Sequence, residues 1–211
     1  MLLNIVRPSL FTLLAALAAT SGAAQAAPCT GVNVGMSSTA DVTFAGIASD
    51  QCVIANLNSQ AGPNGNTSGF STEFGGGWSL LGKVTSSAGS AMFGGVNYAW
   101  TFAQSSGTTG TWSLTTDQNA TFDLVFSMHA GGYSGAFLFD NESTLANQLN
   151  SDTWQINWLN NGGNRPDYSN LTLFIRDAST VTPIPEPSTY ALMFASLGVM
   201  AFVVRRRRAA P

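Results

Sequence analysis

The feature that most constrains the fold is a two-residue alternation of apolar and polar side chains, which recurs through the middle of the chain. From Thr121 to Met128 every second side chain is apolar on one side, and Asp123 and Ser127 lie on the other. Asn97–Phe102 and Thr111–Thr115 follow the same pattern. Successive side chains of a strand point to opposite faces of a sheet. The period therefore predicts antiparallel strands with one face on a core and one face in water.

Shorter segments extend this pattern over the rest of the domain. We predict further strands at 41–47, 52–54, 135–139, 153–158 and 171–176. Asn56–Thr72 is predicted to be a loop, because Gly62–Asn66 brings several turn formers together, and no stretch of the domain favours a long amphipathic helix. About ten short strands, spaced about 8 to 12 residues apart, are typical of an all-β antiparallel β-sandwich. We expect a jelly-roll or lectin-like type, with a closed barrel as the alternative and all five tryptophans in or beside one core.

The N-terminus predicts export. Met1–Ala26 combines Arg7 with an apolar core at Leu10–Ala19 and small residues before Ala26, as in a secretory signal peptide that is cleaved after that residue. Cys29 and Cys52 are the only two cysteines. Since disulfides persist outside the inner membrane, we expect these two cysteines to pair.

The predicted domain, Ala27–Thr180, is acidic. Its three basic residues, Lys83, Arg165 and Arg176, stand against ten acidic ones, which gives a net charge of −7. No basic stripe is present to neutralise phosphates or to dock on an anionic membrane surface. We therefore expect no nucleic-acid partner.

The C-terminal segment, residues 181–211, contains three parts in a fixed order. Pro185, Glu186 and Pro187 form an extended strip, Tyr190–Val204 is free of charge and proline, and Arg205, Arg206, Arg207 and Arg208 end the run. As a helix, residues 190–204 would cover about 22 Å, against about 30 Å for the hydrocarbon core of a bilayer, so the predicted transmembrane helix is short. The arginines would act as a membrane stop on the cytoplasmic side.

This order of tripeptide, apolar helix and arginine cluster resembles the PEP-CTERM sorting signal of bacterial envelope proteins. The resemblance implies that an exosortase, a membrane-embedded cysteine protease or transpeptidase, recognises Pro185–Pro187 and cuts nearby, in a bacterium that makes exopolysaccharide. It also implies a transient stay in the inner membrane, followed by the cell surface or extracellular matrix. Segments between Gly110 and Arg176 also look like the ectodomains of a group of these proteins. An ordinary C-terminal anchor is the alternative, although an anchor has no use for Pro-Glu-Pro.

Few residues suggest catalytic or metal chemistry. Nucleophilic catalysis would depend on His129, the only histidine, and no Gly-x-Ser-x-Gly elbow is present. Asp140 and Glu142 could share a strand face as the carboxylate pair of a glycan-active enzyme, or could form a solvated turn. Asp140–Glu142 or Asp117–Asn119 could also offer oxygen atoms to Ca²⁺, but neither has the spacing of a calcium loop. We expect no catalytic residues, no metal site and no cofactor.

Carbohydrate binding is the better supported alternative. Trp154 and Trp158 could stack on sugars while Asn160 and Asn161 bind hydroxyls, or the two indoles could point into the core above an asparagine turn. The leading hypothesis is a non-enzymatic, exported surface or matrix protein that an exosortase processes and that contacts exopolysaccharide. A lectin-like module is the second hypothesis, and a glycan-active enzyme is the third.

Overall fold

The computed structural model describes residues 26–56, 67–84 and 87–181, together with Arg205. The predicted signal peptide up to residue 25, the strip Pro185–Pro187 and the predicted helix at 190–204 lie outside the described residues. Arg206, Arg207 and Arg208 also lie outside them.

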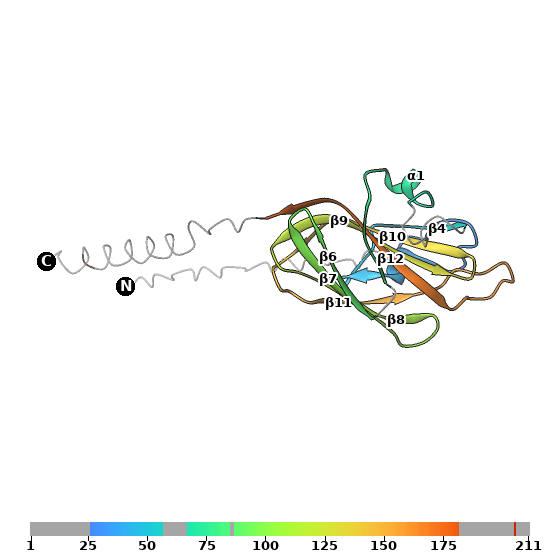
Figure 1. Cartoon of the computed structure of the whole chain (residues 1–211). Coiled ribbons are helices and arrows are strands. Elements are labelled where there is room, and N and C mark those ends of the chain that lie inside the picture. The colour runs from blue at the N-terminus through green and yellow to red at the C-terminus, as the bar shows by residue number, and fades with distance from the viewer. Residues whose placement is uncertain (1–25, 57–66, 85–86, 182–204, 206–211) are drawn as a thin grey trace, which may run out of the picture.

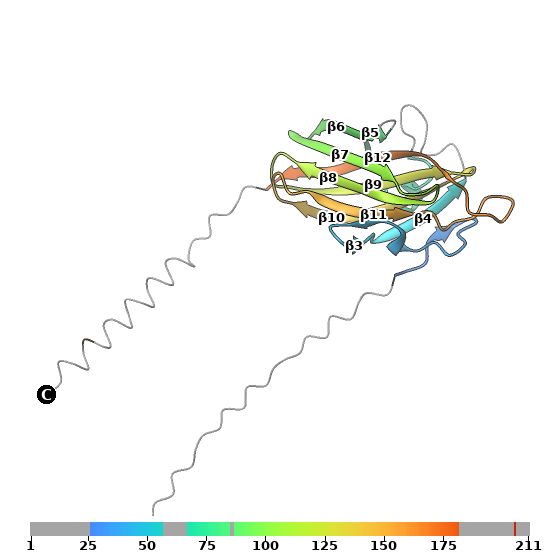
Figure 2. The same cartoon turned by 90° about the horizontal axis from the view of Figure 1, so that it is seen from below.

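The described chain forms two main sheets that face each other (Figure 1, Figure 2). The larger sheet has the order β1 (Thr30–Gly31), β4 (Gln51–Asn56), β10 (Tyr133–Thr144), β9 (Ala120–Ala130), β12 (Tyr168–Thr180) and β5 (Ser79–Val84). The smaller sheet has the order β11 (Asn150–Gln155), β8 (Thr109–Thr116), β7 (Val96–Gln104) and β6 (Ala88–Phe93). Neighbouring strands are antiparallel except β1 and β4, which are parallel.

The all-β prediction is confirmed. The described helices are the short α1 (Ser71–Phe74) and the 3-10 turn η1 (Thr39–Asp41). Both main sheets end in edge strands, so the alternative of a single closed sheet is wrong. The finer jelly-roll or lectin-like type stays a prediction.

The main core lies between the two sheets and follows the predicted alternation. Phe122, Leu124, Phe126 and Met128 of β9 are fully or almost fully buried there. The ring of Phe126 lies 4.7 Å from that of Trp112 on the opposite sheet. Four of the five tryptophans belong to this core, namely Trp100, Trp112, Trp154 and Trp158. Burial of each large ring contributes about 1.5 to 3 kcal/mol, so hydrophobic packing holds the sheets together.

The other face of β9 does not lie in water, contrary to the sequence prediction. Asp123 and Ser127 are only 5% and 2% exposed, and Val125 between them is fully buried. The reason is a second, smaller core, in which Phe70 and Phe74 cover the outer face of the six-stranded sheet and Trp78 packs beside them. Trp78 therefore lies apart from the other tryptophans, and the prediction of one shared core is wrong for this residue.

The segment predicted as a strand over 41–47 is a tight hairpin. It contains β2 (Thr43–Phe44) and β3 (Ile47–Ala48), which pair with each other. Ala45 and Gly46 form the turn with positive φ angles of 51° and 76°, and both of their amides donate to the carboxylate of Asp152, over 2.6 and 2.8 Å. This capped turn ends the strand early. The predicted neighbour at 52–54 instead pairs with β10 and β1.

The remaining predicted strands are present, and most are longer than expected. Strand β11 is the exception, because the ladder ends at Gln155. Ile156 and Trp158 leave the sheet but stay buried, at 1% and 0% exposure.

Candidate functional site

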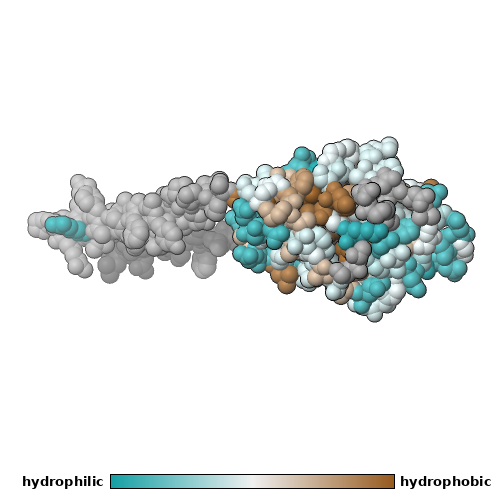
Figure 3. Space-filling view, in the orientation of Figure 1, coloured by the Kyte–Doolittle hydropathy of each residue, from teal (hydrophilic) through white to brown (hydrophobic). Residues whose placement is uncertain are grey.

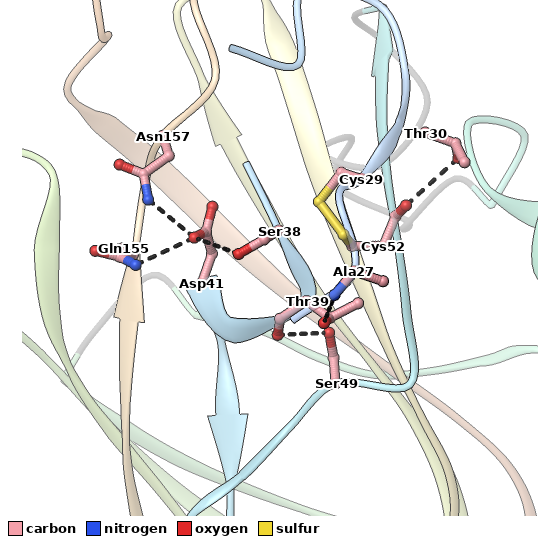
Figure 4. The surroundings of a disulfide bond; sticks show 10 residues. All are labelled: Ala27, Cys29, Thr30, Ser38, Thr39, Asp41, Ser49, Cys52, Gln155 and Asn157. Atoms are coloured by element: carbon pink, nitrogen blue, oxygen red, sulfur yellow. Dashed lines mark hydrogen bonds between the residues drawn. A yellow bond between two sulfur atoms is a disulfide. The ribbon is translucent and has the colours of Figure 1, made fainter. Parts of the chain in front are cut away.

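A disulfide fixes the start of the domain (Figure 4). Cys29 and Cys52 are bonded across a Cα–Cα distance of 4.8 Å, as the sequence predicts. Two residues earlier, Ala27 exchanges hydrogen bonds with Thr39, its amide donating to Oγ1 over 3.1 Å and its carbonyl accepting from the Thr39 amide over 2.8 Å. Closing a loop of this length contributes about 3 kcal/mol in the chain-entropy model. The folded domain therefore begins directly after the predicted signal-peptide cleavage point.

A buried carboxylate beside the disulfide ties the N-terminal segment to the smaller sheet (Figure 4). Asp41 is 1% exposed, and its Oδ1 accepts from Gln155 Nε2 over 3.1 Å and from Asn157 Nδ2 over 2.9 Å. Burial, the dominant effect, raises the pKa of Asp41 despite these bonds. The sequence gives no signal for this role, because the two amides follow Asp41 by more than a hundred positions.

The domain ends shortly before the sorting segment in the sequence. Strand β12 ends at Thr180, and the amide of Val181 donates to the carbonyl of Asn119 over 2.8 Å. Strand β12 pairs with β9 as far as Thr180 and with β5 over Leu171–Ile175. The segment that carries Pro185–Pro187 therefore follows a firmly anchored strand.

The four residues proposed for sugar binding do not form an open site. Trp154 and Trp158 are 1% and 0% exposed, so their indoles are packed in the core and cannot stack on a ligand from solvent. Asn160 Oδ1 accepts from the amides of Gly162 and Asn164, and Asn161 Oδ1 accepts from the Tyr133 hydroxyl. The structure agrees with the alternative in which these tryptophans are core residues above an asparagine turn.

His129 has a serine neighbour that the sequence does not indicate. Its Nδ1 lies 3.2 Å from the hydroxyl of Ser134 on the paired strand β10. Burial, together with the charge of Lys83, lowers the pKa of His129. Ser134 is fully buried, so its hydroxyl is closed to a substrate from solvent in this conformation.

Asp140 and Glu142 lie on opposite faces of the sheet rather than sharing one. An irregularity in β10 places Asp140 and Asn141, which has a φ of +57°, between the pairs Phe139–Leu124 and Glu142–Phe122. Asp140 lies 3.9 Å from Arg176 on the outer side, whereas Glu142 shares the side of the inward-facing Phe122. Among the described residues, no group of three or more His, Cys, Asp or Glu side chains could hold a metal ion.

Glu142 has an unusual environment for a carboxyl group. Burial is the largest cause, and the charges of Asp50 and Asp152 add to it, so that its pKa rises to about 7. The ion pairs of Arg176 lie on the other face of the sheet. Glu142 therefore has an acidic neighbourhood without a balancing cation.

Arg176 is the residue that sequence reasoning missed most clearly. Its Nε lies 2.7 Å from Asp123 Oδ2. Its Nη1 donates to the carbonyls of Phe74 and Gly76 over 2.7 and 3.2 Å. Its Cζ lies 4.1 Å from the ring centre of Trp78. It thus holds residues 70–78 on the sheet. The sequence feature that could have pointed to this role is the scarcity of basic residues, since Arg176 is one of only three between positions 27 and 180.

An all-β domain with a disulfide near its first residues is typical of exported proteins. The PEP-CTERM protein-sorting motif matches residues 183–208, a range that includes Pro185–Pro187 and Arg205–Arg208. The chain therefore carries a PEP-CTERM sorting motif, as predicted, and the motif implies an extracellular protein that an exosortase recognises and sorts.

No curated protein and no solved structure matches the chain. No helix among the described residues is long and apolar enough to cross a membrane. The predicted helix at 190–204 lies outside that part of the chain.

Proposed function

We propose that this protein is a non-enzymatic component of the cell surface or extracellular matrix, delivered by an exosortase in a bacterium that makes exopolysaccharide. The observation that carries the proposal is the position of the sorting motif. The motif begins at residue 183. Among the described residues, Val181, two positions earlier, is the last one that is hydrogen-bonded to the domain. Cleavage near Pro187 would then release or transfer the domain with its strands complete.

The N-terminal end supports the same reading. Cleavage after Ala26 would leave Ala27 bound to Thr39 and Cys29 bonded to Cys52. Both proposed cleavage points therefore flank the two-sheet domain without removing a strand. In this proposal the helix at 190–204 holds the precursor in the inner membrane, with Arg205–Arg208 on the cytoplasmic side.

A non-enzymatic role is favoured by the geometry of the candidate catalytic groups. Asp140 and Glu142 lie on opposite faces of the sheet, whereas a glycosidase needs two carboxyl groups about 5 to 10 Å apart across one sugar. The Ser134 hydroxyl beside His129 is buried. The two carboxyl groups therefore do not face one substrate, and the Ser134 hydroxyl is closed to solvent.

Intact-mass analysis of the secreted protein tests this proposal. In an exosortase-positive strain we expect loss of the C-terminal residues from a point near Pro187, and in an exosortase-deletion strain we expect the full C-terminus to be retained. Pro185→Ala combined with Pro187→Ala should block processing, whereas the matched change Pro183→Ala should leave processing intact. A mature protein that keeps Arg205–Pro211 in the exosortase-positive strain would contradict the proposal.

A further inference from the structure

A hollow of about 700 Å³ opens at the edge of the domain, on the side where strands β5 and β12 of the larger sheet meet β6 and β7 of the smaller one. Its wall is formed by Val84, Ser87, Phe102, Ala103, Gln104, Tyr168, Ser169 and Asn170. This volume falls within the range of about 300 to 1,000 Å³ that is common for small-molecule sites. The hollow is separate from the segment Trp154–Asn161, which the sequence suggested for sugar binding. The buried ring of Trp154 nevertheless packs behind its wall, against Phe102 and Tyr168.

Stacked aromatic rings form one wall of the hollow. Phe102 and Trp154 are almost parallel, with centroids 5.0 Å apart and an interplanar angle of 10°. Tyr168 packs on both, with centroids 4.8 Å from Phe102 and 5.3 Å from Trp154. Trp154 is fixed in the core and Phe102 is only 7% exposed, so these two rings hold the half-buried ring of Tyr168 in place before any ligand arrives. A preorganised ring surface binds without the cost of ordering a flexible side chain.

Several polar groups in the same wall have free hydrogen-bonding capacity. Asn170 Oδ1 is shielded from solvent and has no hydrogen-bond partner, and the Asn170 amide nitrogen makes only a long bond of 3.5 Å to Ser169 Oγ. Gln104 is exposed, and its side chain makes no hydrogen bond to the part of the chain that the structure describes. A ligand hydroxyl could pair with the Gln104 amide directly, and with the Asn170 amide after that side chain turns.

The hollow carries no charge in a domain that is strongly acidic. None of the eight wall residues is Asp, Glu, Lys, Arg or His. A ring surface combined with amide and hydroxyl groups suits a ligand that has one apolar face and many neutral hydroxyls. An anionic or cationic ligand would lose its hydration shell here without gaining a counter-charge.

We propose that this hollow binds neutral sugar units of a glycan, which pack on the half-buried ring of Tyr168 and hydrogen-bond to Gln104, Asn170 and Ser87. The space-filling view shows apolar residues beside hydrophilic ones on the face that it presents (Figure 3). The proposal concerns binding alone. It goes beyond exosortase processing, and it stands or falls separately from it.

The test is a glycan array followed by isothermal titration calorimetry with the purified full-length protein in detergent. The probes are cellohexaose, maltohexaose and mannohexaose as neutral glycans, with polygalacturonate as the acidic comparison. We expect at least one neutral hexasaccharide to bind with a Kd of about 1 mM or tighter. No binding to any neutral glycan, or binding to polygalacturonate alone, would overturn the proposal.

Two substitutions locate the site. Gln104 is exposed, and Gln104→Ala should weaken binding about tenfold or more without changing Tm. Gln148 is an exposed glutamine in the turn before β11, and the control Gln148→Ala should leave binding unchanged. Tyr168→Leu should weaken binding at least as much. Because Tyr168 also packs on the core, hydrogen exchange of the unmodified protein provides a second measurement, with ligand-dependent protection expected at 102–104 and 168–170. Unchanged affinity in Gln104→Ala together with protection elsewhere would reject this hollow as the site.

Discussion

The two faces of the six-stranded sheet are both buried, but they are buried in different ways. The inner face packs against a whole second sheet, and rings from both sheets fill the space between them. The outer face is covered by residues 70–78, which include a single turn of helix, and Arg176 donates to two main-chain carbonyls of this cover. One strand, β9, supplies alternate residues to both sides. The same alternation of residues therefore supports a large hydrophobic core on one face and a small core closed by a charged clamp on the other.

The outer face shows how a short segment can cover a sheet. Residues 70–78 have too few apolar side chains to form a second layer, so their attachment depends on main-chain carbonyls that accept from Arg176 and on the ring of Trp78 beneath its guanidinium. Asp123 completes the clamp from β9. The inner face needs no such arrangement, and its edge carboxyl group, Glu142, is left among acidic neighbours.

The largest expected effect comes from truncating a ring on each face. Phe126 and Phe174 are 0% and 1% exposed and lie on neighbouring strands, Phe126 inside and Phe174 under Phe70. Phe126→Ala should lower the free energy of unfolding by about 4 kcal/mol, because two rigid sheets cannot close the cavity. Phe174→Ala should cost about 2 to 3 kcal/mol, since the short covering segment can settle into the space. Urea unfolding measures both, and an equal or larger loss for Phe174→Ala would show that the cover is as rigid as a sheet.

The next effect is expected at the clamp. Arg176→Met keeps an apolar stem but leaves Asp123 without its cation, and we expect a loss of about 2 to 3 kcal/mol, less than for a fully buried pair because Arg176 retains 18% side-chain exposure. Hydrogen exchange in 70–78 should accelerate well before exchange in β9. Adding Asp123→Asn should recover part of the loss, because no buried charge then remains unpaired.

Arg165→Met is the matched control for this clamp, since Arg165 is exposed. It should change the free energy of unfolding by less than about 0.5 kcal/mol. Uniform exchange rates across residues 70–78 and β9 in Arg176→Met would argue against a separately held cover.

The smallest effect concerns Glu142 and depends on pH. Its pKa in the folded state is raised from 4.5 to about 7, so the folded protein binds more protons than the unfolded chain between these values. Stability of the unmodified protein should therefore fall as the pH rises through this window, and Glu142→Gln should remove that part of the decline. We expect the variant to be more stable by about 1 to 2 kcal/mol at pH 8, after allowance for solvent screening, and equal at pH 4.

Unfolding midpoints in urea at a series of pH values test this expectation. The raised pKa of Asp41 acts in the same direction, but it is present in both proteins and cancels in the difference. A variant that gains the same stability at pH 4 as at pH 8 would show that Glu142 acts through packing rather than through its charge.

Much of the fold was predictable because its signals are local. The alternation in Thr121–Met128 depends only on the two-residue period of a strand, and the structure places its apolar residues in the core. The disulfide between the only two cysteines and the sorting motif at the C-terminal end of the chain were also readable from the sequence, and both are confirmed.

Other features were decided by contacts between distant parts of the chain. The polar side of β9 was expected in water, but Phe70 and Phe74 cover it from a segment about fifty residues earlier. Asp140 and Glu142 were expected to share a face, but an irregularity in β10 separates them. The ring that we propose as the sugar contact is likewise neither Trp154 nor Trp158 but Tyr168, which the meeting of β7 and β12 places against Phe102.

The sequence by itself therefore determined most of the strands and the sorting motif, which implies export. The tertiary structure alone decided what lies against each face of those strands. The physical reason is that the backbone geometry of a strand fixes the direction of alternate side chains over a few residues, whereas burial depends on which distant segment packs there. That choice has no period in the sequence.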